Sequence, residues 1–356
     1  MAAAALLDCY PNPNGRDVVT DLRAFIEGIP KAELHLHIEG TLEPELKFEL
    51  AKRNDVALPY ASAEEMRAGY DYHDLAGFLE IYYEGMGVLR TERDFHDLAM
   101  AYFRKASSQG VVYAEVFFDP QGHTSRGVEF ETVIAGLREA RAEAADTLGL
   151  RSQLIMCFLR DMSAESAMET FEAALPFRNE IVGVGLDSNE RDNPPVKFRE
   201  VFERARTEGL HLTMHCDVDQ DEALQNIRQC LDDIGVERID HGVNCLDDES
   251  LARDIADRGM GLTVCPISNG WVAGGLKAAE IKALLDRGIR ATVNSDDPAY
   301  MDGYVLENLL AVQDAVGLTR DEVAQLERNA FTIAWLDDAD REAYLGDVDA
   351  HVERSG

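Results

Sequence analysis

Residues 33–40 read Glu33-Leu34-His35-Leu36-His37-Ile38-Glu39-Gly40 and open the alternation of strands and helices that runs through the rest of the chain. Pro30 and Gly40 bound the stretch, and its apolar residues alternate with polar ones, which predicts a short strand. Side chains on a strand repeat every two residues, so both imidazoles point to one face and can reach a single metal ion. A histidine pair on a solvated strand face is the alternative, and the motif alone leaves it open.

Further along the chain, short runs rich in β-branched and aromatic residues alternate with segments whose apolar residues recur every three or four positions. The short runs predict strands near 111–118, 153–159, 181–186, 211–215, 238–241, 261–265 and 290–294. The periodic segments predict helices at 42–54, 74–86, 94–107, 129–148, 163–176, 196–208, 221–234, 247–258 and 276–287.

With the opening strand, this pattern predicts eight strands, each followed by a helix, and therefore an α/β fold of the closed parallel (β/α)8 TIM barrel type. Residues 304–345 are expected to form additional C-terminal helices. Because no linker or low-complexity segment stands out, we expect residues 1–356 to form a single barrel domain in which residues 1–20 are a surface extension.

The composition limits the class of partner. The formal net charge is −33 at pH 7, and such a field repels nucleic acid and anionic membranes. The six cysteines include no Cys-x-x-Cys pair and several lie in apolar runs, so we expect buried, reduced thiols and a cytoplasmic protein. The apolar start, residues 1–7, lacks a basic segment and meets Asp8, which argues against a signal peptide or a membrane span.

In barrels of this kind the active site forms at the carboxyl ends of the strands, and the polar residues of this chain gather there. The predicted strand ends carry His35, His37, Asp119, Arg160, Asp161, Asp187, Ser188, His215, His241, Ser268, Asn269, Asp296 and Asp297. We interpret the remaining histidines as surface or loop residues: His73, His96, His123, His211 and His351.

Three imidazoles and one carboxylate suit Zn²⁺ and leave a position for water. We expect the metal ligands to be His35, His37, His215 and Asp296. Zn²⁺ lowers the pKa of a bound water towards 7; His241 would orient or deprotonate that water, and Asp297 would hold the substrate. Two alternatives stay open, namely a capped turn for residues 296–298 and a core histidine, bonded to the backbone, for His241.

These residues lie in segments that resemble the adenosine/adenine deaminase family of metal-dependent amidohydrolases, and more particularly its adenine deaminase branch, from Pro30 to about Leu336. The matching segments are residues 33–45, 117–121, 185–188, 193–195, 238–242, 264–269 and 294–300. The resemblance implies the same four zinc ligands and makes His241 the catalytic base that positions the attacking hydroxide, with Asp296 both ligand and catalytic residue.

The resemblance also implies a purine site. It places Asp297 in a hydrogen bond with N7 of the purine and Ser188 near N3, and Asp187 in the same segment is expected to bind substrate as well. Glu39 stands where adenosine deaminases have the aspartate that contacts ribose, which favours a free base over a nucleoside.

One segment departs from the family pattern. In the family, the fifth-strand histidine opens His-Ala-Gly-Glu, whose glutamic acid protonates the purine ring, whereas residues 215–221 read His-Cys-Asp-Val-Asp-Gln-Asp. Val218 occupies the place of the glutamate and cannot transfer a proton, a step usually worth about 10²- to 10⁴-fold in rate. A shifted loop would present Asp219 as the acid, with Asp217 as the second choice. The alternative is an acidic cluster, including Asp221, that starts a helix.

The leading hypothesis is therefore a Zn²⁺-dependent hydrolase that converts adenine to hypoxanthine and ammonia. The missing glutamate keeps two alternatives open: hydrolysis of an N6-substituted or otherwise modified purine or heterocycle, and a purine-binding protein with little turnover. The expected partner is a small purine, with neither nucleic acid nor membrane.

Overall fold

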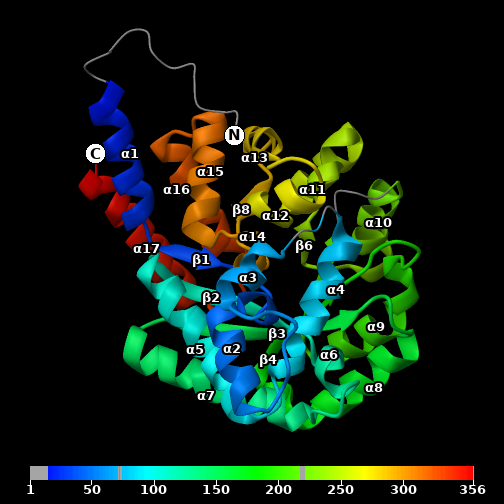
Figure 1. Cartoon of the computed structure of the whole chain (residues 1–356). Coiled ribbons are helices and arrows are strands. Elements are labelled where there is room, and N and C mark those ends of the chain that lie inside the picture. Colours follow the sequence, from blue (N-terminus) through cyan, green and yellow to red (C-terminus); the bar gives the residue numbers. More distant parts are fainter. Residues whose placement is uncertain (1–14, 71, 73, 217–220, 356) are drawn as a thin grey trace.

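The computed structural model describes residues 15–70, 72, 74–216 and 221–355, and its eight parallel strands follow one another around a barrel in sequence order (Figure 1). The strands are β1 (Lys31–Glu33), β2 (Val111–Phe118), β3 (Arg151–Leu159), β4 (Ile181–Asp187), β5 (His211–Cys216), β6 (Arg238–His241), β7 (Gly261–Val264) and β8 (Arg290–Val293). Each pairs in parallel with the next along the chain. The predicted TIM barrel is therefore confirmed.

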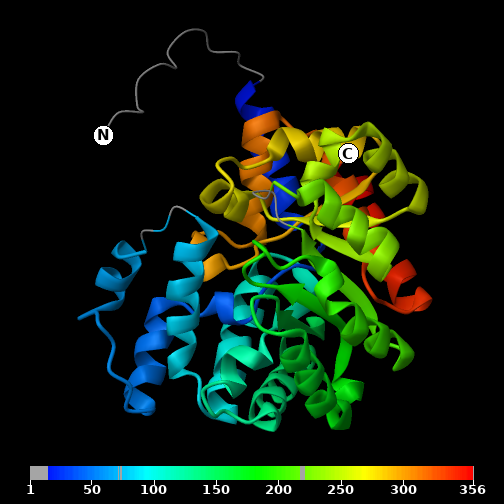
Figure 2. The same cartoon turned by 90° about the vertical axis from the view of Figure 1, so that its right-hand side faces the viewer.

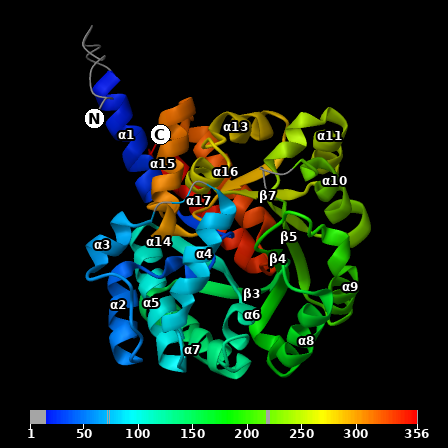
Figure 3. The ribbon, with the colours of Figure 1, turned by 45° about the vertical axis from the view of Figure 1, so that its right-hand side comes forward.

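Helices form a ring outside the strands (Figures 2 and 3). The α-helices are α1 (Gly15–Gly28), α2 (Pro44–Arg53), α3 (Ala63–Ala68), α4 (Leu75–Gly85), α5 (Glu92–Ser108), α6 (Pro120–Thr124), α7 (Phe130–Leu148), α8 (Ala164–Ala174), α9 (Arg199–Thr207), α10 (Ala223–Arg228), α11 (Glu249–Arg258), α12 (Pro266–Val272), α13 (Ala278–Asp286), α14 (Pro298–Met301), α15 (Val305–Val316), α16 (Arg320–Ile333) and α17 (Asp338–Ser355). Because the helices cover the outer face of the barrel, the strands are buried on both faces and read as nearly continuous apolar runs. In β2, for example, every residue but Val112 is buried.

The terminal helices lie together on one side of the barrel (Figure 1). Helix α15 completes the eighth strand–helix unit, and α16 and α17 follow it, so the expected additional helices are present and extend to Ser355. Helix α1 packs beside α15 and α16. Its Phe25 ring lies 4.9 Å from the His351 ring of α17, which ties the two ends of the described chain to each other. The first fourteen residues of the expected surface extension lie outside the described residues.

The predicted strand at residues 33–40 is shorter than expected. Strand β1 ends at Glu33, and the residues after it form only isolated bridges, from Leu36 to Asp296 and from His37 to Phe117. The histidine pair thus lies just beyond the regular strand, between the ends of β8 and β2. The prediction was wrong about the length of the strand because alternation of apolar residues does not reveal where the ladder of hydrogen bonds stops.

The barrel closes at this same place. The backbone N–H of Asp296 donates to the carbonyl of His35 at 3.1 Å, and the N–H of His37 donates to the carbonyl of Asp296 at 3.0 Å. Just before His35, the N–H of Leu34 donates to the side-chain oxygen of Asn294 at 2.8 Å. These bonds join the first strand segment to the last and satisfy backbone groups that an open sheet would leave unpaired.

The opposite end of the barrel is sealed by the tail of the chain. The Trp335 ring stacks on His211 with ring centres 4.9 Å apart, and the guanidinium of Arg238 lies 4.3 Å from the same indole ring. Arg238 in turn donates to Glu115 at 2.6 Å, and both of these side chains are fully buried. A Cβ at Gly183 would lie 2.6 Å from the indole, so the absence of a side chain there makes room for it.

Breaking this buried ion pair is expected to destabilise the protein. Glu115→Gln removes the nearer charge partner of the buried Arg238 guanidinium and leaves only Asp240, 3.9 Å away, which costs about 3 kcal/mol of unfolding free energy. Glu27→Gln removes the exposed partner of Arg23 and should cost less than about 1 kcal/mol. Urea unfolding of both variants checks this; similar losses for the two would contradict a specific role for the buried pair.

Two of the histidines predicted to be surface or loop residues are buried, so that interpretation was wrong for them. His96 on α5 has its Nε2 3.0 Å from Glu143, and His123, at the end of α6, has its Nε2 2.8 Å from Glu39. Their ring nitrogens find partners on distant segments, which a single sequence does not show. Of the other three histidines, His211 and His351 are partly exposed. His73 lies outside the described residues.

The cysteines agree with the expectation of reduced thiols. All five that the structure describes are buried and unpaired: Cys157, Cys216, Cys230, Cys245 and Cys265. Among the described helices, none is both long enough and apolar enough to cross a lipid bilayer.

Candidate metal centre and active site

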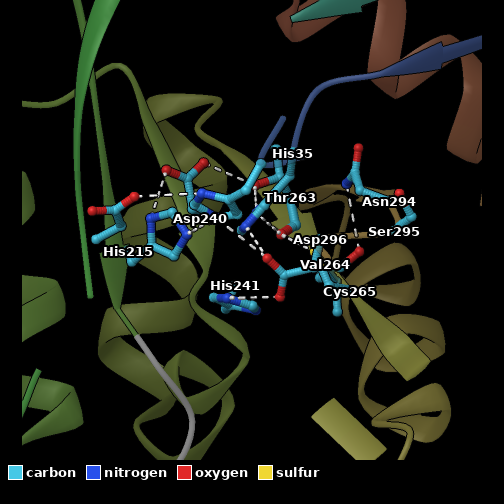
Figure 4. Close-up of polar contacts among 12 residues, drawn as sticks. His35, His215, Asp240, His241, Thr263, Val264, Cys265, Asn294, Ser295 and Asp296 are labelled. Carbon is cyan, nitrogen blue, oxygen red and sulfur yellow. Dashed lines mark hydrogen bonds and ion pairs between the residues drawn. The ribbon is translucent and has the colours of Figure 1, made fainter. Parts of the chain in front are cut away.

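Side chains from distant parts of the chain meet at the carboxyl end of the barrel (Figure 4). One ligand atom each of His35, His215, His241 and Asp296 lies within 4.8 Å of all the others. His37 joins this group, because its Nε2 is 3.4 Å from Asp296 Oδ1 and 3.1 Å from His215 Nε2. None of these five residues is more than 9% exposed. The structure therefore brings together the four expected metal ligands and the expected base.

The contacts of His35 show which of its ring nitrogens faces this cluster. Nδ1 lies 3.1 Å from the carbonyl oxygen of Thr263, which can only accept, so Nδ1 carries the proton. Burial lowers the pKa of His35 and keeps the ring neutral. Nε2 then presents a lone pair to Asp296 Oδ1 at 3.1 Å. Two lone pairs at this distance repel each other unless a cation lies between them, and the arrangement therefore fits a metal ion.

The spacing of the donor atoms also fits a metal ion. The corners of a tetrahedron whose centre is about 2.0–2.1 Å from each of them are about 3.3–3.4 Å apart. The observed separations are 3.1 Å from His35 Nε2 to Asp296 Oδ1, 3.4 Å from His37 Nε2 to Asp296 Oδ1 and 3.1 Å from His37 Nε2 to His215 Nε2. Burial raises the pKa of Asp296, but the neighbouring imidazoles hold it well below its usual range, so the carboxylate is ionised.

Sequence analysis did not identify Asp240, which lies on the side of the His215 ring that faces away from the cluster. Asp240 is fully buried and accepts from the hydroxyls of Thr263 at 2.9 Å and Thr213 at 2.7 Å. Its Oδ2 lies 3.6 Å from Nδ1 of His215, so a carboxylate faces the side of this ring that points away from the cluster, an arrangement that fixes the tautomer of a ligand histidine. The signal was its position in a buried strand beside His241, where an unpartnered carboxylate is costly.

The backbone is strained at the centre of the cluster. His241 and Asp296 have φ angles of +63° and +66°, a left-handed conformation that non-glycine residues rarely adopt and that is concentrated at functional sites. His241 Nε2 lies 3.8 Å from Asp296 Oδ2, and within the described chain its buried Nδ1 has no hydrogen-bond partner. Both features argue against the alternative of a core histidine bonded to the backbone.

Asp297 follows directly and faces the cavity beside the cluster. Burial and the charge of Asp296 raise the pKa of Asp297 well above its usual range, and its buried Oδ1 has no partner among the residues that the structure describes. The short helix α14 begins at Pro298, but Asp297 makes no capping hydrogen bond to it. The alternative of a capped turn therefore does not account for this side chain, whereas a substrate contact does.

Gly40 makes room for Asp297. A Cβ at Gly40 would lie 2.0 Å from Asp297 Oδ1 and 2.7 Å from its Cα, closer than such atoms can approach. The last residue of the opening stretch thus packs its backbone directly against the acidic pair after β8. The glycine is required here by close approach.

Gly40→Ala is expected to displace Asp297 and to lower kcat/KM by about 10²-fold, because a displacement of about 1 Å at a substrate-positioning group costs this much. Steady-state kinetics and thermal unfolding of the purified variant measure the effect. Gly346→Ala, in a helix with nothing within 4 Å of the new methyl, is the matched control and should keep wild-type activity. Full activity of Gly40→Ala would contradict a role for this contact.

The cavity next to the cluster has a polar floor and an apolar wall. It is lined by His37, Leu75, Phe78, Leu79, Tyr82, Tyr83, Asp119, Asp187, Ser188, Glu190, His215, His241, Ser268, Val272, Asp296, Asp297 and Met301. The wall comes mainly from α4, which sequence analysis identified as a helix but did not assign to the site. Three predicted substrate-binding residues, Asp187, Ser188 and Asp297, are therefore on the cavity surface.

Carboxylates and tyrosines line the side of the cavity opposite the cluster. Asp187 Oδ2 lies 3.4 Å from Nδ1 of His37, on the other side of that ring from the metal ligands. Burial raises the pKa of Asp187 to about 6. The Tyr82 hydroxyl donates to Asp119 at 3.2 Å, and the Tyr83 hydroxyl donates to Ser188 Oγ at 2.8 Å. Helix α4 is thus fastened to the ends of both β2 and β4.

Glu39 is not among the residues that line the cavity, and its expected contact with the substrate stays a prediction. The residue is 1% exposed; its Oε1 accepts from the backbone N–H of Asp119 at 3.2 Å and lies 2.8 Å from Nε2 of His123, whereas its buried Oε2 has no partner among the described residues. The expectation relied on the position of Glu39 in a motif. Through Oε1 the side chain positions Asp119.

The position of the proton donor lies outside the described residues. Asp217, Val218 and Asp219 all fall within 217–220, so both expected acids stay predictions. The end of β5 just before them is anchored, because Arg160 is fully buried and donates to the carbonyl of His215 at 2.8 Å.

Comparison with known proteins agrees with this geometry. Residues 30–351 match the model of the family described as adenosine deaminase. The chain belongs to the adenosine deaminase family. Family membership confirms the resemblance proposed from the sequence, and with it a hydrolytic deaminase that acts on a carbon–nitrogen bond. Members of the family are metal-dependent, in agreement with the cluster of imidazoles and carboxylates.

Its relatives share nearly the whole chain. An uncharacterized deaminase from Schizosaccharomyces pombe is 54% identical over 328 residues, which cover 92% of this chain and 97% of that protein. An adenine deaminase from Caulobacter vibrioides is 50% identical over 330 residues, or 92% of this chain and 95% of the relative. The crystal structure of an adenine deaminase from Arthrobacter aurescens superposes with a TM-score of 0.88 at 41% identity, covering 92% of this chain and 100% of the other.

Proposed function

We propose that this protein is a zinc-dependent deaminase that converts adenine to hypoxanthine and ammonia. The observation that carries the proposal is that nitrogens of His35 and His37 lie 3.1 and 3.4 Å from the carboxylate of Asp296, and that Nε2 of His37 lies 3.1 Å from Nε2 of His215. These atoms lie at the carboxyl end of the barrel, beside a cavity with polar and apolar sides. The substrate is inferred from relatives about 50% identical over almost the whole chain that are named adenine deaminase.

In this proposal the metal is held by His35, His37, His215 and Asp296. Nitrogen and oxygen donors in this number suit Zn²⁺, and their separations of 3.1–3.4 Å support the assignment. When bound, Zn²⁺ supplies Lewis acidity that makes water nucleophilic at neutral pH.

In this proposal the protein side chains act as the base, bind the purine ring and exclude water. His241 faces the cavity with an unpartnered Nδ1 and a strained backbone, which suits a base that orients a water and takes its proton. Burial and the charge of Asp296 raise the pKa of Asp297, which favours the protonated carboxyl group, and this form can donate to N7, an acceptor on the purine ring. The apolar wall from α4 covers the flat faces of the ring and excludes water.

The first test is catalysis. Purified protein with a measured zinc content should release ammonia from adenine, with hypoxanthine identified by chromatography. Adenosine and N6-methyladenine are tested in parallel, since the missing glutamate keeps a modified purine open as the substrate. Full zinc occupancy with no release of ammonia or amine from any of the three would overturn the proposed function.

The second test separates metal ligands from the base. His37→Ala is expected to lose bound zinc, measured by plasma mass spectrometry, because it removes a nitrogen that faces both His215 and Asp296. His241→Ala should keep close to one zinc per chain and lose about 10²- to 10⁴-fold in kcat, the usual contribution of a general base. The reverse result, with zinc lost only from His241→Ala, would exchange the two roles.

The expected partner is a small purine, and the net charge of −33 supports the proposal that neither nucleic acid nor an anionic membrane is bound. A cytoplasmic location stays a prediction from the reduced cysteines. The proposal that residues 1–356 form one domain is supported by a hydrophobic core that extends from α1 to α17.

A further inference from the structure

One contact at the cavity is not explained by binding a metal or by activating water. The Tyr83 hydroxyl on α4 donates to Ser188 Oγ, at the end of β4, at 2.8 Å. Both side chains line the cavity and both are partly exposed, so the pair lies at the boundary between the cavity and solvent. The contact closes one end of the cavity by joining two segments that are 105 residues apart in the sequence.

The place of this pair relative to the metal ligands follows from the His37 ring. Its Nε2 faces Asp296 and His215, whereas its Nδ1 faces Asp187 at 3.4 Å. Ser188 follows Asp187, so the Tyr83–Ser188 pair belongs to the part of the cavity on the Nδ1 side of this ring. The closed end of the cavity is therefore on that side, and not on the Nε2 side that faces the metal ligands.

Purine geometry determines what occupies that end. C6 and N7 lie on one edge of a purine, and N3 and N9 lie on the opposite edge. If C6 faces the metal ligands and N7 faces Asp297, the N3–N9 edge faces Ser188. A free base carries only a hydrogen on this edge, whereas a nucleoside carries a ribose on N9 that would collide with the closed end.

The hydrogen bond also determines what Ser188 can offer. When the phenol of Tyr83 donates to Ser188 Oγ, the serine keeps its own hydrogen for another acceptor. Ser188 has a φ of +72°, a left-handed conformation that non-glycine residues rarely adopt. The strained backbone and the bond from Tyr83 together aim the hydroxyl at the edge of the ring that bears N3.

We propose that Tyr83 is a positioning residue that restricts the site to free purine bases, by closing the N9 end of the cavity together with Ser188 and by orienting the Ser188 hydroxyl as a donor to the ring. This inference rests on the proposed function and names the device that selects its substrate class.

Three variants test it, with adenine, 9-methyladenine and adenosine as substrates. Tyr83→Phe removes only the hydroxyl and should raise KM for adenine about tenfold, the effect of one lost hydrogen bond, with kcat nearly unchanged. Ser188→Ala also removes the proposed donor to the ring, so it should raise KM at least as much. The double variant should be no worse than Ser188→Ala alone, because Tyr83 acts on the ring through Ser188. Tyr83→Ala should open the cavity and raise kcat/KM for 9-methyladenine relative to adenine by at least about tenfold.

The control is Tyr344→Phe, which removes a tyrosine hydroxyl on α17, where the ring stacks on Phe331 away from the cavity. This variant should keep the wild-type kcat and KM for all three substrates. Zinc content and melting temperature are measured for every variant. Unchanged KM values together with an unchanged preference for adenine over 9-methyladenine in the Tyr83 variants would overturn the inference, even with an active wild type. A wild-type enzyme that releases no ammonia from adenine would overturn the proposed function and the inference with it.

Discussion

The whole site depends on how the barrel closes. The backbone bonds between the segment after β1 and the segment after β8 run through His35, His37 and Asp296 themselves, at 3.0 and 3.1 Å. The same bonds that join the first strand to the last therefore align two imidazoles with a carboxylate. Fold and site are not separable here: any change that opens the seam between β1 and β8 also separates the candidate metal ligands. This coupling explains why the chain tolerates a strained φ angle at Asp296.

The strand order and the positions of the ligands could be read from the sequence for a simple physical reason. Strands buried on both faces are nearly continuous apolar runs, and in a parallel barrel their carboxyl ends converge, so the polar residue after each run marks the site. His215 and Asp296 were found in this way, without any knowledge of distances. What could not be read were the contacts between side chains on distant segments.

Three examples show contacts that the sequence alone does not reveal. Asp240 supports the His215 ring, but a carboxylate inside a strand does not reveal its partners. Glu39 has the N–H of Asp119 and the ring of His123 as partners, which its place in a motif does not reveal. The wall made by α4 depends on how the long connection between β1 and β2 folds back over the barrel, which periodicity within a helix does not specify.

The seal at the other end of the barrel has a consequence for synthesis of the protein. Trp335 and the segment around Asp296 both come from the last part of the chain, so a polypeptide still emerging from the ribosome holds strands with unpaired edges at both ends of an unfinished sheet. Such edges are sites of aggregation until the final segments arrive. The nascent chain therefore exposes these edges for most of its translation, and a chain that ended before Asp296 would lack both the closing seam and one candidate metal ligand.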